Sequence, residues 1–384
     1  MAGQRLRVLV LFGGRSAEHE VSCLSARSVL ATLDPDRYLV TTVGITRQGR
    51  WTLVNGVAET PDGTLPQVGD DGDTVALVQT RKGPRLVRFG DTPVVDADPA
   101  GGASGTSAFP GQDLGPVDVC FPVLHGPYGE DGTVQGLLSS AGVPYVGADV
   151  ASSAVGIDKR QMKNVFAARG LPQVPYVAVA RPDWEADRDA VLAEVEAALA
   201  YPLFSKPARQ GSSIGIRRCP DRDELVAGVE EAFDFDRMAI VERGLTGVRE
   251  IECGVIGNAE VEVTPPGEVS TSHEFYDFEG KYLDDALVLR CPARVPAEVA
   301  DTCSRYAREA YLAIGCRGMA RVDFFYDEPA GQVYVNEINT IPGFTPASMF
   351  PYVWQTQGLT YPQLLDRLLR LALDAARSDA RYAP

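Results

Sequence analysis

Basic residues are scarce in this chain of 384 residues. It contains 36 Lys and Arg against 52 Asp and Glu, which gives a formal net charge of −16 at pH 7, and only 3 His. Because negative charge repels phosphate backbones and anionic lipids, general binding to nucleic acid or to a membrane surface is disfavoured. Lysine is restricted to five positions, each a candidate for a specific role: Lys82, Lys159, Lys163, Lys206 and Lys281.

Paired cysteines and long hydrophobic segments are also missing. The 7 cysteines are odd in number, widely spread and without a CxxC pair, so neither a disulfide framework nor a zinc site is predicted. Buried thiols in a reducing compartment fit this usage. The apolar run at residues 8–12 is too short for the core of a signal peptide, and no segment approaches the length of a membrane span. We therefore expect no membrane insertion and a cytoplasmic location.

What remains is the composition of a folded globular protein. Apolar residues make up 45% of the chain and charged residues 23%, which argues against extended disorder and against fibrous repeats. At roughly 150 residues per domain, the length predicts two to three domains.

The N-terminal part is predicted to form an α/β domain, residues 1–147. Its apolar run at residues 8–12 ends at a Gly-Gly pair, and Ser16 follows as the predicted N-cap of a helix that reaches about Leu30. A continuous apolar strand, a tight turn and a helix in this order are typical of a parallel sheet. Two more strands are expected, at residues 117–124 and 143–146.

Residues 56–115 have the character of an insertion in this domain. Gly, Pro and Asp recur around two alternating stretches, residues 74–79 and 85–89, with Lys82 and Gly83 between them. This pattern predicts a β-hairpin flanked by mobile loops.

The rest of the chain is predicted to divide into residues 148–244 and 245–384. No internal repeat and no heptad pattern is present. We expect helices at residues 152–169, 222–233 and 361–377, and strands at residues 203–206, 238–242, 249–256, 319–326 and 332–338.

The most informative pattern is a pair of predicted strands joined by a turn at residues 327–331. Side chains two apart share one face of a strand, so Arg321 lies with Asp323 and Glu337 lies with Asn339. An antiparallel pairing would bring these oxygen-bearing side chains together. Two carboxylates and an amide, without His or Cys, suit a hard cation such as Mg²⁺. A solvated hairpin face is equally compatible with this pattern taken alone.

A second pattern combines a lysine with a loop of small residues. Lys206 ends a predicted strand, and Gly and Ser dominate residues 210–215. Small residues let backbone N–H groups approach phosphate oxygens, and the lysine adds a positive charge. The Gly-Lys-Ser order of a Walker loop is missing. A plain connecting loop is the alternative.

The first strand is also followed by a glycine turn, but a dinucleotide site is not predicted there. The turn lacks the GxGxxG spacing, and Glu18 places a carboxylate where a dinucleotide phosphate would lie. A carboxylate in the first turn of a helix could instead receive a substrate ammonium group. Simple helix capping is the alternative.

Three further motifs are weaker. His125 begins a glycine-rich stretch at the end of a predicted strand, where open α/β sheets place their ligands. Asp158 and Lys159 could form a surface ion pair. Lys281 ends an aromatic, acidic stretch in which a glycine suggests mobility. Together, the lysines, the small-residue loop and the carboxylate pair predict phosphoryl transfer, hence an ATP-dependent enzyme.

Four sequence strings extend this interpretation, because in this order and spacing they resemble the D-alanine–D-alanine ligases of the ATP-grasp superfamily. They are HGPYGEDGTVQG, SKPARQGSSIGI, EFYDFEGKY and RVDFFYDEPAGQVYVNEINTIPGFTPASMFP. The resemblance spans nearly the whole chain. It implies an α/β fold of three domains: an N-terminal Rossmann-like open sheet, a central ATP-grasp subdomain with the phosphate loop, and a C-terminal ATP-grasp subdomain with the metal site and a mobile loop.

The resemblance also implies a function. Two D-alanine molecules would be joined at the expense of ATP, through a D-alanyl phosphate, as a step of peptidoglycan precursor synthesis for the cell wall. ATP and two Mg²⁺ or Mn²⁺ ions would be required. A homodimer is implied as well.

Residue roles follow from the same resemblance. Nucleotide binding would fall to Lys159, Lys206, Gly211, Ser213, Glu242, Arg243, Leu245 and Glu250. The metal ions would be held by Asp323, Glu337 and Asn339. The reacting substrates would be handled by Glu18, His125, Ser212, Lys281, Tyr282, Arg321, Gly343 and Ser348.

Within the last set, the resemblance assigns Glu18 and His125 to the ammonium group of the first D-alanine. Tyr282 would join Ser212 and Glu18 in a hydrogen-bonded group that holds the mobile loop closed. Closure would exclude water and protect the acyl phosphate.

The remaining members serve the second half of the reaction. Arg321 and the backbone N–H of Gly343 would stabilise the oxyanion of the tetrahedral intermediate. Ser348 and Lys281 would receive the carboxylate of the second D-alanine.

Three rival functions are compatible with parts of the pattern. A D-alanine–D-lactate ligase is the nearest, although Tyr282 favours an amine as the second nucleophile. A non-catalytic ATP-binding relative would be expected to have lost Arg321 or metal ligands, which are present. An α/β oxidoreductase using the N-terminal glycine turn lacks the GxGxxG spacing.

Overall fold

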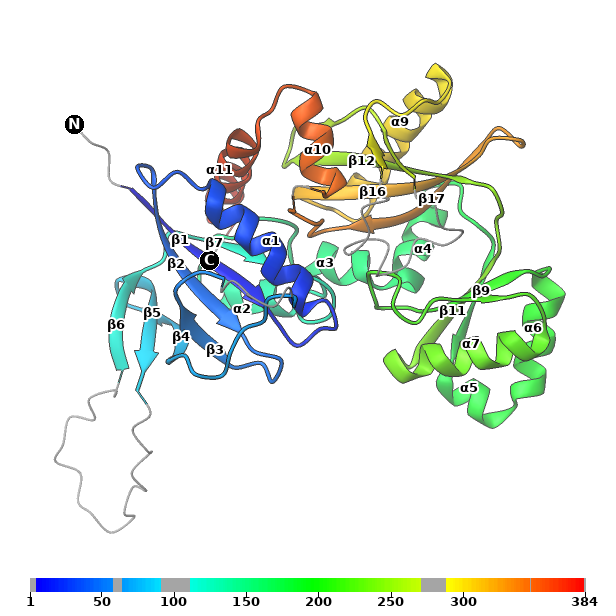
Figure 1. Cartoon of the computed structure of the whole chain (residues 1–384), viewed down its shortest axis with the longest axis horizontal. Coiled ribbons are helices and arrows are strands. Elements are labelled where there is room, and N and C mark those ends of the chain that lie inside the picture. Colours follow the sequence, from blue (N-terminus) through cyan, green and yellow to red (C-terminus); the bar gives the residue numbers. More distant parts are fainter. Residues whose placement is uncertain (1–4, 58–63, 91–110, 271–287, 346, 383–384) are drawn as a thin grey trace, which may run out of the picture.

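Three β-sheets follow one another along the chain (Figure 1). The computed structural model describes residues 5–57, 64–90, 111–270, 288–345 and 347–382. None of the helices in these ranges is both long and apolar enough to cross a bilayer.

The first sheet has seven strands in the order β6-β5-β4-β3-β2-β1-β7. β1 pairs in parallel with β2 and β7, and the other neighbours are antiparallel. Its elements are β1 (Leu6–Gly13), α1 (His19–Thr32), β2 (Tyr38–Ile45), β3 (Trp51–Val54), β4 (Thr74–Thr80), β5 (Gly83–Phe89), β6 (Gly111–Pro116), β7 (Val119–Val123) and α2 (Thr133–Ser140).

The predicted strand at the N-terminus is confirmed, but the predicted helix start is wrong. The helix α1 begins at His19 and Glu18 is its N-cap. Ser16 uses its hydroxyl elsewhere, donating to the carbonyl of His125 at 2.7 Å and accepting from the Glu18 N–H at 3.1 Å. Ser16 therefore ties the turn after β1 to the loop after β7 instead of capping the helix.

The predicted hairpin is confirmed as β4 and β5, but it is not a separate appendage. Through β3 and β6 it extends the first sheet. The loops predicted on either side fall largely at residues 58–63 and 91–110, outside the described residues. The strand predicted at residues 143–146 is reduced to one bridge between Tyr145 and Cys120, because glycines with positive φ, Gly142 and Gly147, stand at both ends.

The second sheet is antiparallel, in the order β10-β9-β11-β8. The helix predicted at residues 152–169 is instead two helices, because Asp158 has an extended backbone and its carboxylate accepts from the Gln161 N–H at 3.1 Å. This cap makes Lys159 the first residue of α4. The elements are α3 (Val150–Ile157), α4 (Lys159–Ala168), β8 (Tyr176–Ala180), α5 (Arg181–Ala186), α6 (Arg188–Ala198), β9 (Leu203–Pro207), β10 (Arg217–Cys219), α7 (Arg222–Phe235) and β11 (Met238–Arg243).

The third sheet runs β15-β14-β12-β16-β17, with β13 paired to β12. The predicted pairing of its last two strands is confirmed: Asp323 lies opposite Glu337 and Arg321 lies opposite Asn339. The elements are β12 (Arg249–Gly257), β13 (Val261–Val263), β14 (Gly267–Ser270), β15 (Val288–Arg290), α9 (Ala297–Ala313), β16 (Gly318–Asp327), β17 (Gln332–Asn339), α10 (Met349–Thr356) and α11 (Tyr361–Asp379).

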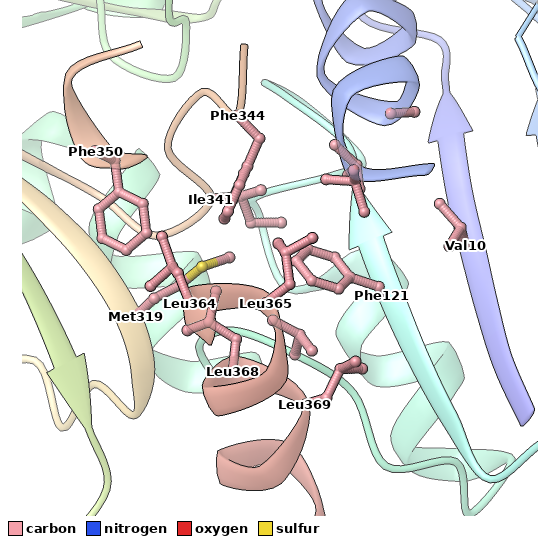
Figure 2. Close-up of a cluster of buried hydrophobic side chains, with 14 of the residues drawn as sticks. Val10, Phe121, Met319, Ile341, Phe344, Phe350, Leu364, Leu365, Leu368 and Leu369 are labelled. Atoms are coloured by element: carbon pink, nitrogen blue, oxygen red, sulfur yellow. The ribbon is translucent and has the colours of Figure 1, made fainter. Parts of the chain in front are cut away.

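One hydrophobic cluster joins the first sheet to the third (Figure 2). Phe344, in the loop after β17, packs edge to face against Phe121 of β7 and Phe350 of α10, each with ring centroids 5.6 Å apart. The amphipathic helix predicted at the C-terminus is confirmed as α11, and it adds Leu364, Leu365, Leu368 and Leu369. This shared core fixes the loops after β1, β7 and β17 beside one another.

Candidate active site

A pocket of about 330 Å³ is lined by residues from all three sheets. Every site residue predicted from the sequence that lies in the described part of the chain lines this pocket. Lys281 and Tyr282 lie outside the described residues. The lining residues with these predicted roles are Glu18, His125, Lys159, Lys206, Gly211, Ser212, Ser213, Glu242, Arg243, Leu245, Glu250, Arg321, Asp323, Glu337, Asn339, Gly343 and Ser348.

One end of the pocket, here called the lysine end, is formed by Lys206 and Glu242, and the buried Lys163 contacts Glu242 from outside the pocket lining. Antiparallel pairing of β9 with β11 brings Lys206 near Glu242, and their Nζ and Oε2 atoms are 2.6 Å apart. Lys163 of α4 places its Nζ 2.6 Å from the other oxygen, Oε1. Burial would raise the pKa of Glu242, but the two lysines outweigh burial and lower that pKa to about 2. Glu242 is therefore a buried, ionised carboxylate.

The walls beside the lysine end are apolar, which the sequence predictions did not include. They are formed by Val174, Phe204, Ile216, Phe324 and Phe325. Strand period two puts Phe204 on the same face as Lys206, so the alternation in β9 could have identified it. Apolar walls with a few polar groups are typical of a site for a planar base.

The small-residue loop after β9 lies between the lysine end and the N-terminal sheet. Lys159 donates from Nζ to the carbonyl of Gln210 at 2.6 Å. Ser212 and Ser213 have positive φ values of 47° and 59°, which side chains rarely adopt. Strained backbone of this kind is concentrated at functional sites.

Gly211 in this loop lies against Glu18. A Cβ at Gly211 would be 2.8 Å from Glu18 Oε2, and the Ser212 hydroxyl donates to Oε1 of the same carboxylate. The predicted link between Ser212 and Glu18 is thus present, and it ties the loop to the start of α1.

The strand pair β16 and β17 places a guanidinium among carboxylates. Arg321 donates from Nε and Nη2 to the two oxygens of Asp323, each at 2.7 Å, and its Nε lies 2.8 Å from Glu252. Burial alone would lower the pKa of Arg321, but Asp323 and Glu252 outweigh it and raise the pKa. Glu252 was missed, although it is two residues from Glu250 on β12 and therefore shares its face.

The same strands contain the predicted metal ligands. Asn339 donates from its amide nitrogen to Asp323 at 2.9 Å, and Glu337 lies 3.6 Å from the Lys159 ammonium. In the described part of the chain, His, Cys, Asp and Glu do not gather into a cluster of three that could hold a metal by themselves. Two carboxylates and an amide leave positions for water and phosphate oxygens, which is the donor set that Mg²⁺ prefers. The residues therefore fit the predicted ion.

The opposite end of the pocket, here called the glutamate end, consists of Glu18, Glu130 and His125. Its polar groups come from the loops after β1 and β7. Glu130 accepts hydrogen bonds from the N–H groups of Gly126 at 2.7 Å and Ile341 at 3.1 Å. It therefore bridges the loop after β7 and the loop after β17.

Glu130 has the opposite electrostatic setting to Glu242. Burial, and then the charges of Glu18 and Glu337, raise the pKa of Glu130 to about 8, against the lowering effect of its two backbone N–H donors. Its carboxyl group is therefore protonated at neutral pH. The sequence predictions did not include Glu130, although it lies in the glycine-rich string that begins at His125.

His125 is buried and neutral. Burial lowers the pKa of its imidazole to about 4. Nδ1 lies 3.0 Å from the carbonyl of Ile341, an acceptor, so Nδ1 carries the proton and Nε2 accepts from the Ser25 hydroxyl at 3.0 Å. Nδ1 thus joins the loop after β7 to the loop after β17, and Nε2 joins it to α1, in addition to the contribution of His125 to the pocket lining.

Gly343 and Ser348 complete the pocket near the start of α10. The Ser348 hydroxyl accepts from the Thr345 N–H at 3.0 Å. A Cβ at Gly343 would be 2.7 Å from that hydroxyl, so only glycine leaves it accessible at this place.

The arrangement defines a class of enzyme. A lysine-bearing strand with a small-residue loop faces a sheet whose paired strands carry carboxylates, and this is how ATP-grasp enzymes enclose their nucleotide. Comparisons with known proteins agree and go further. The family model for the D-ala D-ala ligase N-terminus matches residues 7–148, and that for the D-ala D-ala ligase C-terminus matches residues 165–370.

Similar proteins and structures extend over nearly the whole chain. The D-alanine–D-alanine ligase of Kineococcus radiotolerans is 48% identical over 380 residues, which cover 96% of each chain. That of Paenarthrobacter aurescens is 44% identical and covers 96% and 95%. Among solved structures, the D-alanine–D-alanine ligase from Coxiella burnetii has a TM-score of 0.78 and 33% identity, and covers 99% of this chain and 97% of that one.

A VanG D-Ala:D-Ser ligase from Enterococcus faecalis is almost as similar, with a TM-score of 0.77, 35% identity and coverage of 96% and 100%. The chain belongs to the D-alanine–D-alanine ligase family. It is therefore an ATP-dependent ligase with the ATP-grasp fold, and the predictions of fold and enzyme class are confirmed.

Proposed function

We propose that this ligase joins two D-alanine molecules into D-alanyl-D-alanine, for the synthesis of peptidoglycan precursors. One observation carries the proposal: a single pocket brings Lys159, Lys206 and the paired carboxylates of β16 and β17 together with the buried Glu18, a group suited to an ammonium ion. The carboxylate of the first D-alanine attacks the γ-phosphate of ATP and forms D-alanyl phosphate and ADP. The amine of the second D-alanine attacks the acyl carbon, and phosphate leaves.

The lysine end holds the nucleotide in this proposal. Glu242, with backbone groups from Arg243 to Leu245, receives the adenine, and Glu250 receives the ribose hydroxyls. Lys159 and Lys206 bind the phosphates.

The loop and the metal ligands act on the phosphate groups. Residues 211–215 close over the phosphates, and Gly211 and Ser213 present backbone N–H groups to them. Asp323, Glu337 and Asn339 would hold two Mg²⁺ or Mn²⁺ ions. Bound there, the ions neutralise charge on the transferring phosphoryl group.

The glutamate end and the start of α10 handle the amino acids. Glu18 and His125 orient the first D-alanine through its ammonium group. Arg321 and the Gly343 N–H stabilise the oxyanion of the tetrahedral intermediate. Ser348 binds the carboxylate of the second D-alanine in this proposal.

Two proposed partners of these residues lie outside the described ranges. Lys281 would share the second carboxylate with Ser348. Tyr282 would join the Ser212 and Glu18 pair that holds the loop closed.

The decisive experiment measures phosphate release from MgATP with D-alanine, with L-alanine as control and with products identified by mass. Release coupled to D-alanyl-D-alanine supports the proposal. ATP binding without turnover would instead support the non-catalytic relative, and absence of ATP binding would overturn the proposal entirely.

The identity of the second substrate needs its own comparison. The likeness to VanG, a D-Ala:D-Ser ligase, makes D-serine a second candidate for the second substrate. Mixtures of D-alanine with D-serine or D-lactate distinguish the cases. If a mixed dipeptide or an ester is the main product, D-serine or D-lactate replaces D-alanine as the proposed second substrate.

Domain limits, location and assembly complete the proposal. The boundary between residues 147 and 148 precedes the second sheet, and that between 244 and 245 lies where β11 ends and β12 has not begun. All 7 cysteines are unpaired, which supports a cytoplasmic location. A homodimer is proposed on family resemblance.

A further inference from the structure

Lys163 is a buried lysine to which none of the roles above applies. It lies on α4, four residues after Lys159, and its side chain is 1% exposed. It is not among the residues that line the pocket, whereas Glu242 is. A buried charge is costly unless it is paired, so the position of Lys163 next to Glu242 requires an explanation.

Glu242 is bound by two ammonium groups, one on each carboxylate oxygen. Lys163 contacts Oε1 and Lys206 contacts Oε2, both at 2.6 Å. The two lysines differ in their surroundings, because Lys206 lines the pocket beside the phosphate loop and Lys163 does not. Lys206 can therefore turn to a ligand, while Lys163 is confined.

Nucleotide binding as proposed above changes the partners of Glu242. Lys206 is drawn to the phosphates, and the 6-amino group of adenine, a neutral donor, takes its place at the carboxylate. Without a second cation, the nearly fully buried carboxylate of Glu242 would then have only a neutral hydrogen-bond donor as its partner. Such a group takes up a proton, and one of its oxygens then donates a hydrogen bond instead of only accepting.

We propose that Lys163 is the resident counter-ion of Glu242, a positioning residue that keeps this carboxylate charged and aimed at the adenine amino group when Lys206 turns to the phosphates. The inference rests on the proposed nucleotide site and adds a determinant of base preference. An ionised carboxylate only accepts hydrogen bonds, so it favours the 6-amino group of adenine and repels the 6-oxo group of hypoxanthine.

The electrostatics of the pair support this assignment. Burial lowers the pKa of Lys163, and Glu242 opposes that shift. The Lys163 ammonium also lies 5.1 Å from the ring centroid of Tyr176, whose face favours a cation. The Glu242 carboxylate and the Tyr176 ring thus favour the charged form of Lys163, against burial, which still leaves its pKa below the ordinary value.

The test compares ADP with IDP, in the presence of Mg²⁺, by calorimetric binding to Lys163→Met, Lys163→Arg and the wild-type chain. Lys82→Met is the matched control, since Lys82 is exposed in the turn between β4 and β5. We expect Lys163→Met to weaken ADP about tenfold or more and IDP much less, so that the preference for adenine falls. Lys163→Arg restores the preference in part, and Lys82→Met leaves it unchanged.

Steady-state kinetics give a second readout. In Lys163→Met the KM for ATP rises, while the KM for D-alanine stays within about twofold. An unchanged ratio of ADP to IDP affinity in folded Lys163→Met would overturn the proposal, as would equal weakening of both nucleotides. Calorimetry needs no D-alanine, so it tests the role of Lys163 separately from the proposed function. If the wild-type chain makes no dipeptide but Lys163→Met still loses the preference for adenine, the proposed function is refuted and the role of Lys163 is not.

A double mutant shows whether Lys163 acts through Glu242. In a Glu242→Gln background, Lys163→Met is expected to cost no further adenine preference. If Lys163→Met does not fold by itself, the double variant, which lacks both charges, is measured instead. A preference for ADP over IDP equal to that of the wild type in the double variant would overturn the proposal. If the double variant does not fold either, ADP and IDP are compared in Glu242→Gln, where a wild-type preference for ADP would again overturn the proposal.

Discussion

Glu242 and Glu130 line the same pocket and differ in charge. At the lysine end, two ammonium groups hold the pKa of Glu242 at about 2. At the glutamate end, burial and neighbouring carboxylates raise the pKa of Glu130 to about 8. The comparison shows that burial by itself does not decide the charge of an enclosed carboxyl group, because nearby cations can outweigh it.

The difference also matches the chemistry at each end. An ionised Glu242 suits a hydrogen-bond donor such as an adenine amino group. A protonated Glu130 adds no negative charge beside Glu18, whose carboxyl group is proposed to receive the one ammonium group bound there. A second ionised carboxylate there would repel the first.

The largest expected effect comes from Glu337, a proposed metal ligand whose charge also acts on the glutamate end. Glu337 raises the pKa of Glu130 and lies beside Lys159. Glu337→Gln should reduce ATP-dependent turnover by roughly 1000-fold or more, because a proposed metal ligand is lost. Phosphate release checks this, with Glu309→Gln on the exposed side of α9 as control. A near-normal rate would contradict the metal assignment.

The next test compares how Glu242 and Glu130 contribute to the free energy of unfolding. Glu242→Gln leaves two buried lysines without their counter-ion and should lower the free energy of unfolding by roughly 3 kcal/mol. Glu130→Gln loses one of two acceptors, at a cost of about 1 kcal/mol, but it also removes a group that must take up a proton on folding at pH 7, so the free energy of unfolding should stay unchanged or rise. Urea unfolding measures both. Equal losses would mean that the two carboxyl groups do not differ in charge.

The pH dependence of stability sharpens the comparison. Between pH 5 and 7 folded Glu130 keeps its proton, with a pKa of about 8, while the unfolded chain, with its usual value of 4.5, releases it. Glu130 therefore makes the free energy of unfolding fall by about 2 kcal/mol over this interval as the pH rises. The difference between wild type and Glu130→Gln isolates this slope, and identical slopes would refute the raised pKa.

Glu242 should act in the opposite direction. Its pKa is lowered from 4.5 to about 2, so its stabilisation is present above pH 4.5 and is lost as the pH falls toward 2. Unfolding of wild type and Glu242→Gln across this acid range provides the measurement.

The smallest effect concerns the loop between the two ends. Gly211→Ala would put a methyl group 2.8 Å from Glu18 Oε2, so the loop should close less readily and kcat should fall about tenfold. Gly136→Ala on α2 is the matched control, since a Cβ there meets nothing within 4 Å and alanine favours a helix by up to about 1 kcal/mol. Equal activity of the two variants would show that the Gly211 contact is unimportant.

Much of the site could be predicted from local patterns. The faces of β16 and β17 followed from strand period two, because alternation is a property of the backbone, and the observed register pairs Asp323 with Glu337. The helix break at Asp158 was missed because the apolar spacing continues across it, although an Asp before the second helix is a capping signal.

Contacts between residues that are far apart in the sequence could not be predicted from local patterns. Lys163 was visible as one of few lysines, but nothing near it in the sequence indicates its contact with Glu242 on β11. Glu130 was visible within a glycine-rich string, but its contact with the Ile341 N–H depends on the loop after β17. Both contacts join segments that only folding brings together.

The sequence by itself determined which side chains share a face, which strands carry the lysine and the carboxylates, and which family the chain resembles. These are consequences of local backbone geometry and of residue order. The tertiary structure alone decided which carboxyl groups are ionised, which lysine can leave its partner and which one is confined. Desolvation and charge interactions act over a few ångströms in space, and those distances are set by the packing of all three sheets.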